Sequence, residues 1–167
     1  MKVKKLVLMA LLTAVALIIF TVEAQIPNPT PIPGVKLGLA NIVTVYAMFA
    51  LGPAPTFMIL LCRVFLGSIF AGHMMTVLYS LGGGILCYGA MLIMRRFVTP
   101  RQIWVCSVVG AVFHNIGQII VAILITRTLE LIAYLPLLLV SGIIAGVFTG
   151  LCAQLILRRL PGQVRKK

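Results

Sequence analysis

The chain has 167 residues, of which 62% are hydrophobic and only 10% are charged, and its formal net charge at pH 7 is +12. In a water-soluble domain roughly a quarter of the residues are charged, so this composition excludes a water-soluble domain. The sequence contains no Asp, and its only acids are Glu23 and Glu130. This excludes paired-carboxylate catalysis, carboxylate-held magnesium and a Ser-His-Asp triad. We therefore expect no enzyme activity, no cofactor and no metal.

Apolar stretches follow one another along the whole chain. A membrane-spanning helix needs about 20 mainly apolar residues. The second stretch is short, and Gly52-Pro53 separates it from the third because proline breaks helices. The pattern predicts an all-α integral membrane protein in which one domain, 1–167, forms a bundle of six transmembrane helices. The expected helices are 6–24, 37–51, 55–71, 74–94, 102–126 and 133–157.

Basic residues lie in clusters at the ends of these stretches, as membrane topology requires, rather than over a face that would bind nucleic acid. Eleven of the 14 Lys and Arg residues precede the first stretch, separate the fourth from the fifth, or lie in the basic tail 158–167. Cytoplasmic segments of membrane proteins are enriched in Lys and Arg. Both termini are therefore expected in the cytoplasm, and no nucleic-acid partner is expected.

The first stretch has a second interpretation. Its basic start, its apolar run and the small-residue pattern Val22-Glu23-Ala24 also fit a secretory signal peptide. Cleavage after Ala24 would leave five spans and an external N-terminus, and the remaining charges would fit equally well. The segment 26–36 then follows, and its four prolines rule out a helix. It is either a plain connector or a stiff lid over a pocket on the outer face.

Polar side chains inside the spans are the candidates for a binding site. Arg63 lies near the middle of the third span, where an arginine costs about 2.5–3.5 kcal/mol on insertion scales and needs a partner. Glu23 is expected at the outer edge and Glu130 in an outer loop, so neither is expected to pair with Arg63. The alternatives are backbone carbonyls, a neighbouring protein or an anionic ligand.

The fifth span carries the densest group of polar side chains. His114 and Gln118 are four residues apart and share one helix face, and Asn115 lies beside them. They either join helices by hydrogen bonds or contact a ligand. No second His or Cys falls at the spacing of a metal site. The residues expected to contact the ligand are Lys36, Asn41, Arg63, Tyr88, His114, Asn115 and Gln118.

Small residues also recur at helical spacing, which lets helices approach closely in lipid. Gly142, Gly146 and Gly150 are expected to pack within the monomer. For Ala10 and Ala14 of the first span, packing within the monomer and binding of a partner both stay open.

Four motifs stand out: Pro33-Gly-Val-Lys-Leu-Gly-Leu-Ala-Asn-Ile42, Leu51-Gly-Pro53, Arg63-Val-Phe-Leu-Gly67 and Ser80-Leu-Gly-Gly-Gly84. Together they resemble the Gx transporter family, whose members are often labelled heptaprenyl diphosphate synthase component I. The layout is also similar to the S components of energy-coupling factor (ECF) transporters. That similarity implies a retained first helix, an external loop that closes over the ligand, and docking of Ala10 and Ala14 on a transmembrane coupling subunit driven by ATPases. It places the chain as a multi-pass protein of a bacterial plasma membrane.

Three functional hypotheses follow. The first is a substrate-binding membrane subunit that captures a small vitamin-type nutrient or precursor, with energy supplied by partner subunits. The second is a non-catalytic accessory subunit of heptaprenyl diphosphate synthesis. It would be non-catalytic because synthases of this kind resemble other diphosphate enzymes in using Asp-rich motifs, and this chain has no Asp. The third is a facilitator that works without partners.

Overall fold

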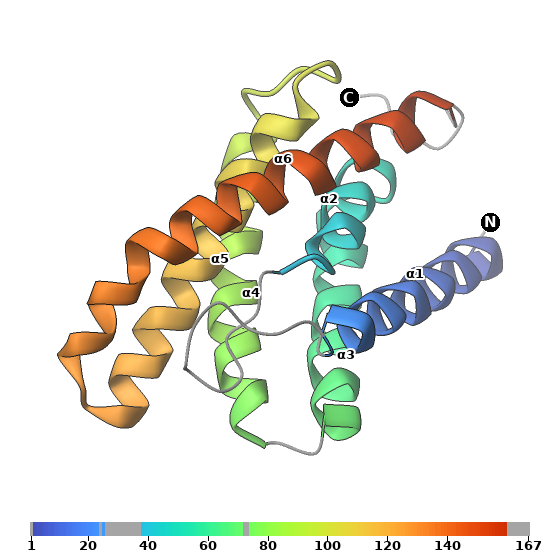
Figure 1. Cartoon of the computed structure of the whole chain (residues 1–167). Helices are drawn as coiled ribbons and strands as arrows, with labels where there is room; N and C mark the ends of the chain where they lie inside the picture. Colours follow the sequence, from blue (N-terminus) through green and yellow to red (C-terminus); the bar gives the residue numbers. More distant parts are fainter. Residues whose placement is uncertain (1, 24, 26–37, 72–73, 160–167) are drawn as a thin grey trace.

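The computed structural model describes residues 2–23, 25, 38–71 and 74–159, and all regular structure in these ranges is helical (Figure 1). The Pro-rich loop 26–36, which contains the predicted lid 27–35 and the predicted ligand contact Lys36, lies outside the described residues, as does the tail beyond Arg159. The interpretations given for them stay predictions. The elements are α1 Lys2–Glu23, α2 Asn41–Ala50, α3 Pro53–Ala71, α4 Met74–Met94, α5 Ile103–Thr126, the 3₁₀ helix η1 Leu129–Tyr134 and α6 Leu135–Arg159.

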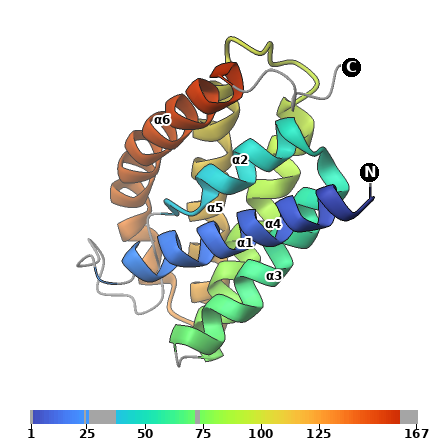
Figure 2. The same ribbon diagram turned by 90° about the vertical axis from the view of Figure 1, so that its right-hand side faces the viewer.

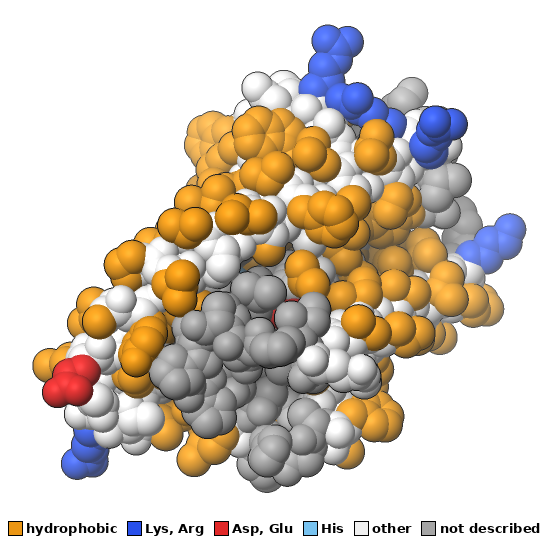
Figure 3. All heavy atoms as spheres, viewed as in Figure 1, with side chains coloured by type: hydrophobic (Ala, Val, Ile, Leu, Met, Phe, Trp, Pro, Cys, Tyr) orange, Lys and Arg blue, Asp and Glu red, His pale blue; other side chains and the backbone are white. Residues whose placement is uncertain are grey.

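Five of these helices are long and apolar enough to cross a membrane, namely α1, α3, α4, α5 and α6. Figure 3 shows an apolar surface along the bundle, with Lys and Arg side chains near the start of α1, the end of α6 and the connection between α4 and α5, and at the lower left. Such a continuous apolar surface suits lipid rather than water. These features support a multi-pass membrane protein. The side of the membrane on which each terminus lies stays a prediction.

The second helix is shorter than predicted. The sequence predicts a span over 37–51, but α2 has only 10 residues, or about 15 Å at the usual rise of an α-helix. That is about half of the hydrocarbon core of a bilayer. Gly38 and Gly52 flank α2 with φ angles of +82° and +94°, which glycine adopts readily. The backbone therefore turns at both places, and α2 does not form a sixth full span.

Helices α4, α5 and α6 approach one another closely through glycines. A methyl group at Gly117 of α5 would lie only 2.6 Å from the carbonyl oxygen of Gly82 on α4. A methyl group at Gly150 of α6 would lie 2.6 Å from the Cα atom of Trp104 on α5. These contacts leave room for a hydrogen atom alone, as in other membrane helix pairs with small residues. They confirm packing within the monomer for the glycines of α6, Gly142, Gly146 and Gly150.

Helix α1 lies against α3 and α2 (Figure 2), and its contacts are made by side chains. Ala16 of α1 belongs to a buried cluster with Val43 of α2 and Ile59 of α3. Nearer the end of α1, the ring of Phe20 covers Gly67 of α3, where an added methyl group would lie 3.0 Å from the Cε1 atom of Phe20. The remaining faces of α1 are largely exposed.

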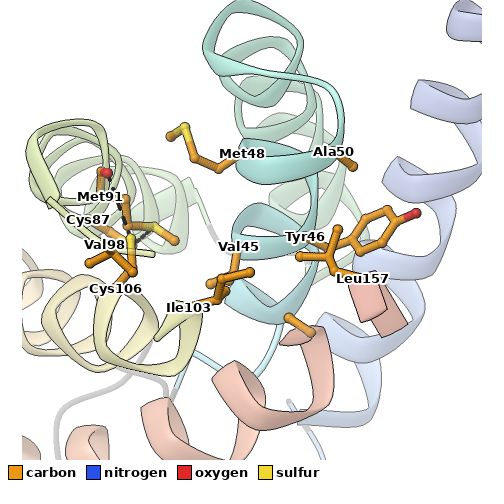
Figure 4. Packing of buried hydrophobic residues seen from close by; sticks show 11 residues of the cluster. Val45, Tyr46, Met48, Ala50, Cys87, Met91, Val98, Ile103, Cys106 and Leu157 are labelled. Carbon is orange, nitrogen blue, oxygen red and sulfur yellow. Dashed lines mark hydrogen bonds between the residues drawn. The ribbon is translucent and has the colours of Figure 1, made fainter. Parts of the chain in front are cut away.

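A second cluster joins α2 to the other helices. Val45 of α2, Met91 of α4, Cys106 of α5 and Leu157 of α6 belong to one buried group (Figure 4). The Cys106 thiol donates to the carbonyl oxygen of Met91 at 3.7 Å. This cluster fixes α2 between α4 and α6, so that the turn before α2 is held next to the polar part of α5.

Candidate ligand-binding site

A cavity lies where α1, α3, α4 and α5 meet the turn that precedes α2. Its free volume is about 20 Å³, which holds about one water molecule. Phe20, Gly38, Ala40 and Val64 form the apolar part of the wall. The polar part of the wall consists of Glu23, Arg63, Ser80, His114 and Gln118.

Helix α5 contributes His114 and Gln118, which are 4% and 1% exposed. The His114 ring fits between two glycines from different elements. A methyl group at Gly38 would lie 3.1 Å from the ring atom Cδ2, and one at Gly83 of α4 would lie 2.9 Å from Nδ1. Beside the ring, the Oε1 atom of Gln118 has no hydrogen-bond partner in the described part of the chain.

Helices α3 and α2 contribute Arg63 and Asn41, which are 5% and 4% exposed. Both terminal nitrogens of Arg63 donate to the Oδ1 atom of Asn41, at 3.5 Å each. These bonds are long compared with the usual 2.7–3.2 Å for N–H···O bonds. Among the described residues, the guanidinium of Arg63 makes these two hydrogen bonds, and the Nδ2 atom of Asn41 has no hydrogen-bond partner.

Glu23 is the charged cavity residue that the sequence did not predict for the site. It is expected at the outer edge, away from Arg63, but it lines the same cavity and is only 3% exposed. The backbone N–H of Gly38 donates to its Oε1 atom at 2.5 Å, and its carboxylate acts electrostatically on Arg63. The Glu23 carboxylate therefore lines the same cavity as Arg63, whereas the sequence placed it away from that residue. The reason is that α1 leans on α3 and brings its last turn beside the cavity.

The other predicted residues lie elsewhere. The Asn115 side chain donates to the carbonyl oxygen of Leu138 and lies against Gly142, so it belongs to the contact between α5 and α6. Tyr88 is not among the residues that line the cavity, and its ring lies against Phe57 of α3 with a centroid distance of 5.2 Å. These two side chains face neighbouring helices, whereas Ser80 and Phe20, which the sequence did not single out, line the cavity.

Comparison with protein families identifies the group to which the chain is related. The sequence profile of a family described as heptaprenyl diphosphate synthase component I matches residues 12–156. The chain belongs to this family. The match runs from α1 to α6 and includes the described residues of the cavity wall. Neither a search of curated proteins nor a search of solved structures gave a significant match. The resemblance to the family that carries this label is thus confirmed, and the similarity to ECF S components stays a prediction.

Proposed function

We propose that this protein is a non-catalytic membrane subunit that binds a small polar molecule in the cavity between α1, α3, α4 and α5. One observation carries the proposal. Five polar side chains from four helices, each at most 7% exposed, converge on one cavity. A buried polar atom without a hydrogen-bond partner lowers the stability of the fold by about 1–3 kcal/mol. Natural proteins therefore keep such atoms mainly where water, an ion or a ligand provides the missing partner.

Other buried polar residues of the same bundle differ from the cavity group. The hydroxyl groups of Ser107 on α5 and Thr149 on α6 are hydrogen-bonded to each other at 3.0 Å. The amide nitrogen of Asn115 is likewise used by Leu138. Asn115 also keeps a partnerless Oδ1 atom, but it lies at the contact between α5 and α6, whereas the partnerless Oε1 atom of Gln118 belongs to a residue of the cavity wall. The contrast supports ligand binding, rather than helix joining, as the role of the cavity group.

The observed cavity holds about one water molecule, so a larger ligand requires the wall to yield. The part of the wall that packs least closely is α1, because it contacts α3 and α2 through side chains while α4 and α5 meet at backbone atoms. Phe20 and Glu23 both belong to α1. In this proposal, the end of α1 moves away from Gly67 and Gly38 when the ligand enters.

Uptake is the transport role that we propose for this binding step. The chain has no phosphate-binding loop, so partner subunits would supply energy. Ala10 and Ala14 are exposed on α1 and lie four residues apart, which allows close approach of another helix. We assign them to docking of a transmembrane coupling subunit that works with ATPases.

The family description favours a second candidate, an accessory subunit of a heptaprenyl diphosphate synthase. The catalytic partner would then supply the Asp-rich metal site that this chain lacks. The cavity is a poor match for the diphosphate group itself, because its one described cation, Arg63, is accompanied by Glu23. Co-purification with a soluble Asp-rich prenyl synthase, rather than with ATP-binding proteins, would favour this candidate.

A thermal-unfolding screen of the purified chain against vitamins, precursors and other metabolites tests the binding role. A ligand at about 100 times its Kd stabilises the folded state by about 2.7 kcal/mol, which is readily measured as a rise in Tm. We expect Gln118→Leu to abolish the rise. Gln154→Leu is the matched control, because Gln154 is also buried with a partnerless Oε1 atom but does not line the cavity. The absence of any stabilising compound, or equal loss in both variants, would contradict the proposal.

A further inference from the structure

A groove runs along the outside of the bundle, on the side where α2 lies between α1 and α6 (Figure 2). It is lined by α1 from Leu8 to Ile19, by residues of α2 that include Tyr46, and by Ile156 of α6. Its free volume is about 370 Å³, against about 20 Å³ for the polar cavity. Apart from the Tyr46 hydroxyl, the described lining side chains are apolar. The groove therefore suits an apolar occupant much larger than a water molecule.

The dimensions of the groove match a single acyl chain. From Leu8 to Ile19 the lining extends for about 16 Å along α1 at the usual rise of a helix. One leaflet supplies half of a hydrocarbon core that is about 30 Å thick, so its acyl chains reach a similar depth. A helix is about 10–12 Å across with its side chains, and over this length it would occupy about 1,200 Å³, roughly three times the free volume. The groove thus has room for an acyl chain and not for the helix of another protein.

The groove lies on a different face of α1 from the face assigned to the coupling subunit. Leu8, Leu12 and Val15 line the groove, and their spacing is that of one helix face. Ala10 and Ala14 are each offset by two residues from a lining leucine, and residues two apart do not share a face. An occupant of the groove therefore leaves Ala10 and Ala14 accessible.

Basic side chains lie at one end of the groove. Lys4 and Lys5 precede Leu8 by about one helical turn, and α6 ends with Arg158 and Arg159 just after its lining residue. All four basic side chains are exposed. The start of α1 and the end of α6 lie on the same side of the bundle (Figure 1). An acyl chain in the groove would therefore place its headgroup next to these cations.

Neither of the two acidic side chains in the sequence lies near these cations. Glu23 is the last residue of α1, about 27 Å along the helix from Lys5. Glu130 lies in η1, before the start of α6, whereas Arg158 lies in the last turn of that helix. Lys and Arg side chains near a membrane surface attract anionic lipids, and arginine binds phosphate through parallel hydrogen bonds. The charge at this end of the groove complements an anionic headgroup.

We infer that the groove between α1 and α6 holds one acyl chain of an anionic phospholipid, whose phosphate lies among Lys4, Lys5, Arg158 and Arg159. A zwitterionic phospholipid offers the same chain, but its ammonium group brings a positive charge toward the cations and weakens binding. The inference concerns a second site, so it does not depend on the ligand of the polar cavity.

Native mass spectrometry of the full chain tests this inference. The chain is purified in detergent with equal amounts of dioleoyl-phosphatidylglycerol and dioleoyl-phosphatidylcholine, which have the same acyl chains and differ in headgroup charge. We expect one retained phosphatidylglycerol per chain and about tenfold less phosphatidylcholine, because several cations act on one phosphate. Equal retention of the two lipids, or retention of neither, would overturn the inference.

A substitution that fills the groove tests its location. Val15→Trp places a large side chain among the lining residues, and we expect at least a tenfold loss of retained phosphatidylglycerol. Val7→Trp is the matched control, because Val7 is also an exposed valine of α1 but does not line the groove. Thermal unfolding shows whether both variants fold. Equal retention by two folded variants would overturn the inference, since the lipid would then lie elsewhere.

A pair of charge substitutions tests the headgroup contact. Arg158→Gln combined with Arg159→Gln should reduce the preference for phosphatidylglycerol over phosphatidylcholine severalfold. Arg95→Gln combined with Arg96→Gln is the matched control, because it removes two adjacent arginines that follow α4 and lie away from the groove lining. An equal reduction in both double variants would overturn the inference, because the preference would then reflect the overall charge of the chain.

Discussion

Helices α4, α5 and α6 meet at glycines, whereas α1, α2 and α3 meet at side chains. The glycine-packed half contributes the uncharged polar groups of the cavity, on Ser80, His114 and Gln118. The side-chain-packed half contributes the charged groups, on Glu23 and Arg63. The cavity therefore lies between a half whose backbones are in contact and a half that can adjust by rotating side chains. The glycine-packed half positions the uncharged hydrogen-bonding groups. The position of Glu23 relative to Arg63 depends on how α1 packs against α3.

The largest expected effect concerns the charged half. Arg63→Gln removes the buried positive charge on which the Glu23 carboxylate acts and the two hydrogen bonds to Asn41, and we expect a loss of about 3 kcal/mol in the free energy of unfolding. Adding Glu23→Gln should recover part of this loss, because the two charges act on each other in the wild type. Unfolding by a denaturing detergent measures both variants and the double variant. Arg96→Gln, at an exposed arginine, should have little effect. Strictly additive effects at positions 23 and 63 would contradict the account of the cavity.

The glycine-packed half is tested by adding a side chain at its tightest contact. Gly117→Val places a methyl group against the carbonyl oxygen of Gly82, and overpacking of this kind costs about 1–3 kcal/mol. Gly89→Val is the matched control on α4, since a Cβ atom at Gly89 meets nothing within 4 Å. Thermal unfolding of the two variants in the same detergent compares them. Equal melting temperatures would show that the α4–α5 contact is looser than described.

Two neighbouring polar residues of α5 should behave differently. Asn115→Ala removes the bond to Leu138 and should lower the free energy of unfolding by about 1 kcal/mol while ligand binding is retained. Gln118→Leu should have the opposite profile, with ligand binding lost and stability nearly unchanged. Calorimetric titration with the ligand and thermal unfolding, both made on each variant, separate the two roles. Loss of binding in both variants would place Asn115 in the site.

The smallest expected effect concerns a bond that joins α5 to α6. Thr149→Val removes the hydroxyl that pairs with Ser107. Interhelical hydrogen bonds in a membrane protein contribute about 0.6 kcal/mol on average, and we expect a loss of that size in detergent-induced unfolding. A loss several times larger would mean that this pair, and not glycine packing, holds α6 in place.

Much of the helical layout follows from hydropathy and length. The fourth predicted helix, 74–94, coincides with α4, and the fifth differs from α5 by one residue at its start. The second prediction failed because hydropathy counts apolar residues and does not detect a backbone that turns at Gly38. The shared face of His114 and Gln118 was visible in the sequence, since residues four apart lie on one side of a helix.

The presence of Glu23 and Arg63 in one cavity was not visible in the sequence. Glu23 is the last residue of an apolar helix, and its depth in the bundle depends on how α1 is tilted against α3. That tilt depends on the contact between Phe20 and Gly67, which joins residues 47 positions apart and leaves no local pattern. The separation of Asn115 from Gln118 also depends on packing, because Asn115 turns toward α6 and Gly142.

The central claim is that the cavity between the two halves holds a small polar molecule, and native mass spectrometry tests it most directly. The chain is incubated with a metabolite extract, purified in detergent and transferred intact to the gas phase. We predict one small-molecule adduct on the wild type and on Asn115→Ala, and its absence from Gln118→Leu. A wild-type chain that carries no adduct, or an adduct that persists in Gln118→Leu, would contradict the account.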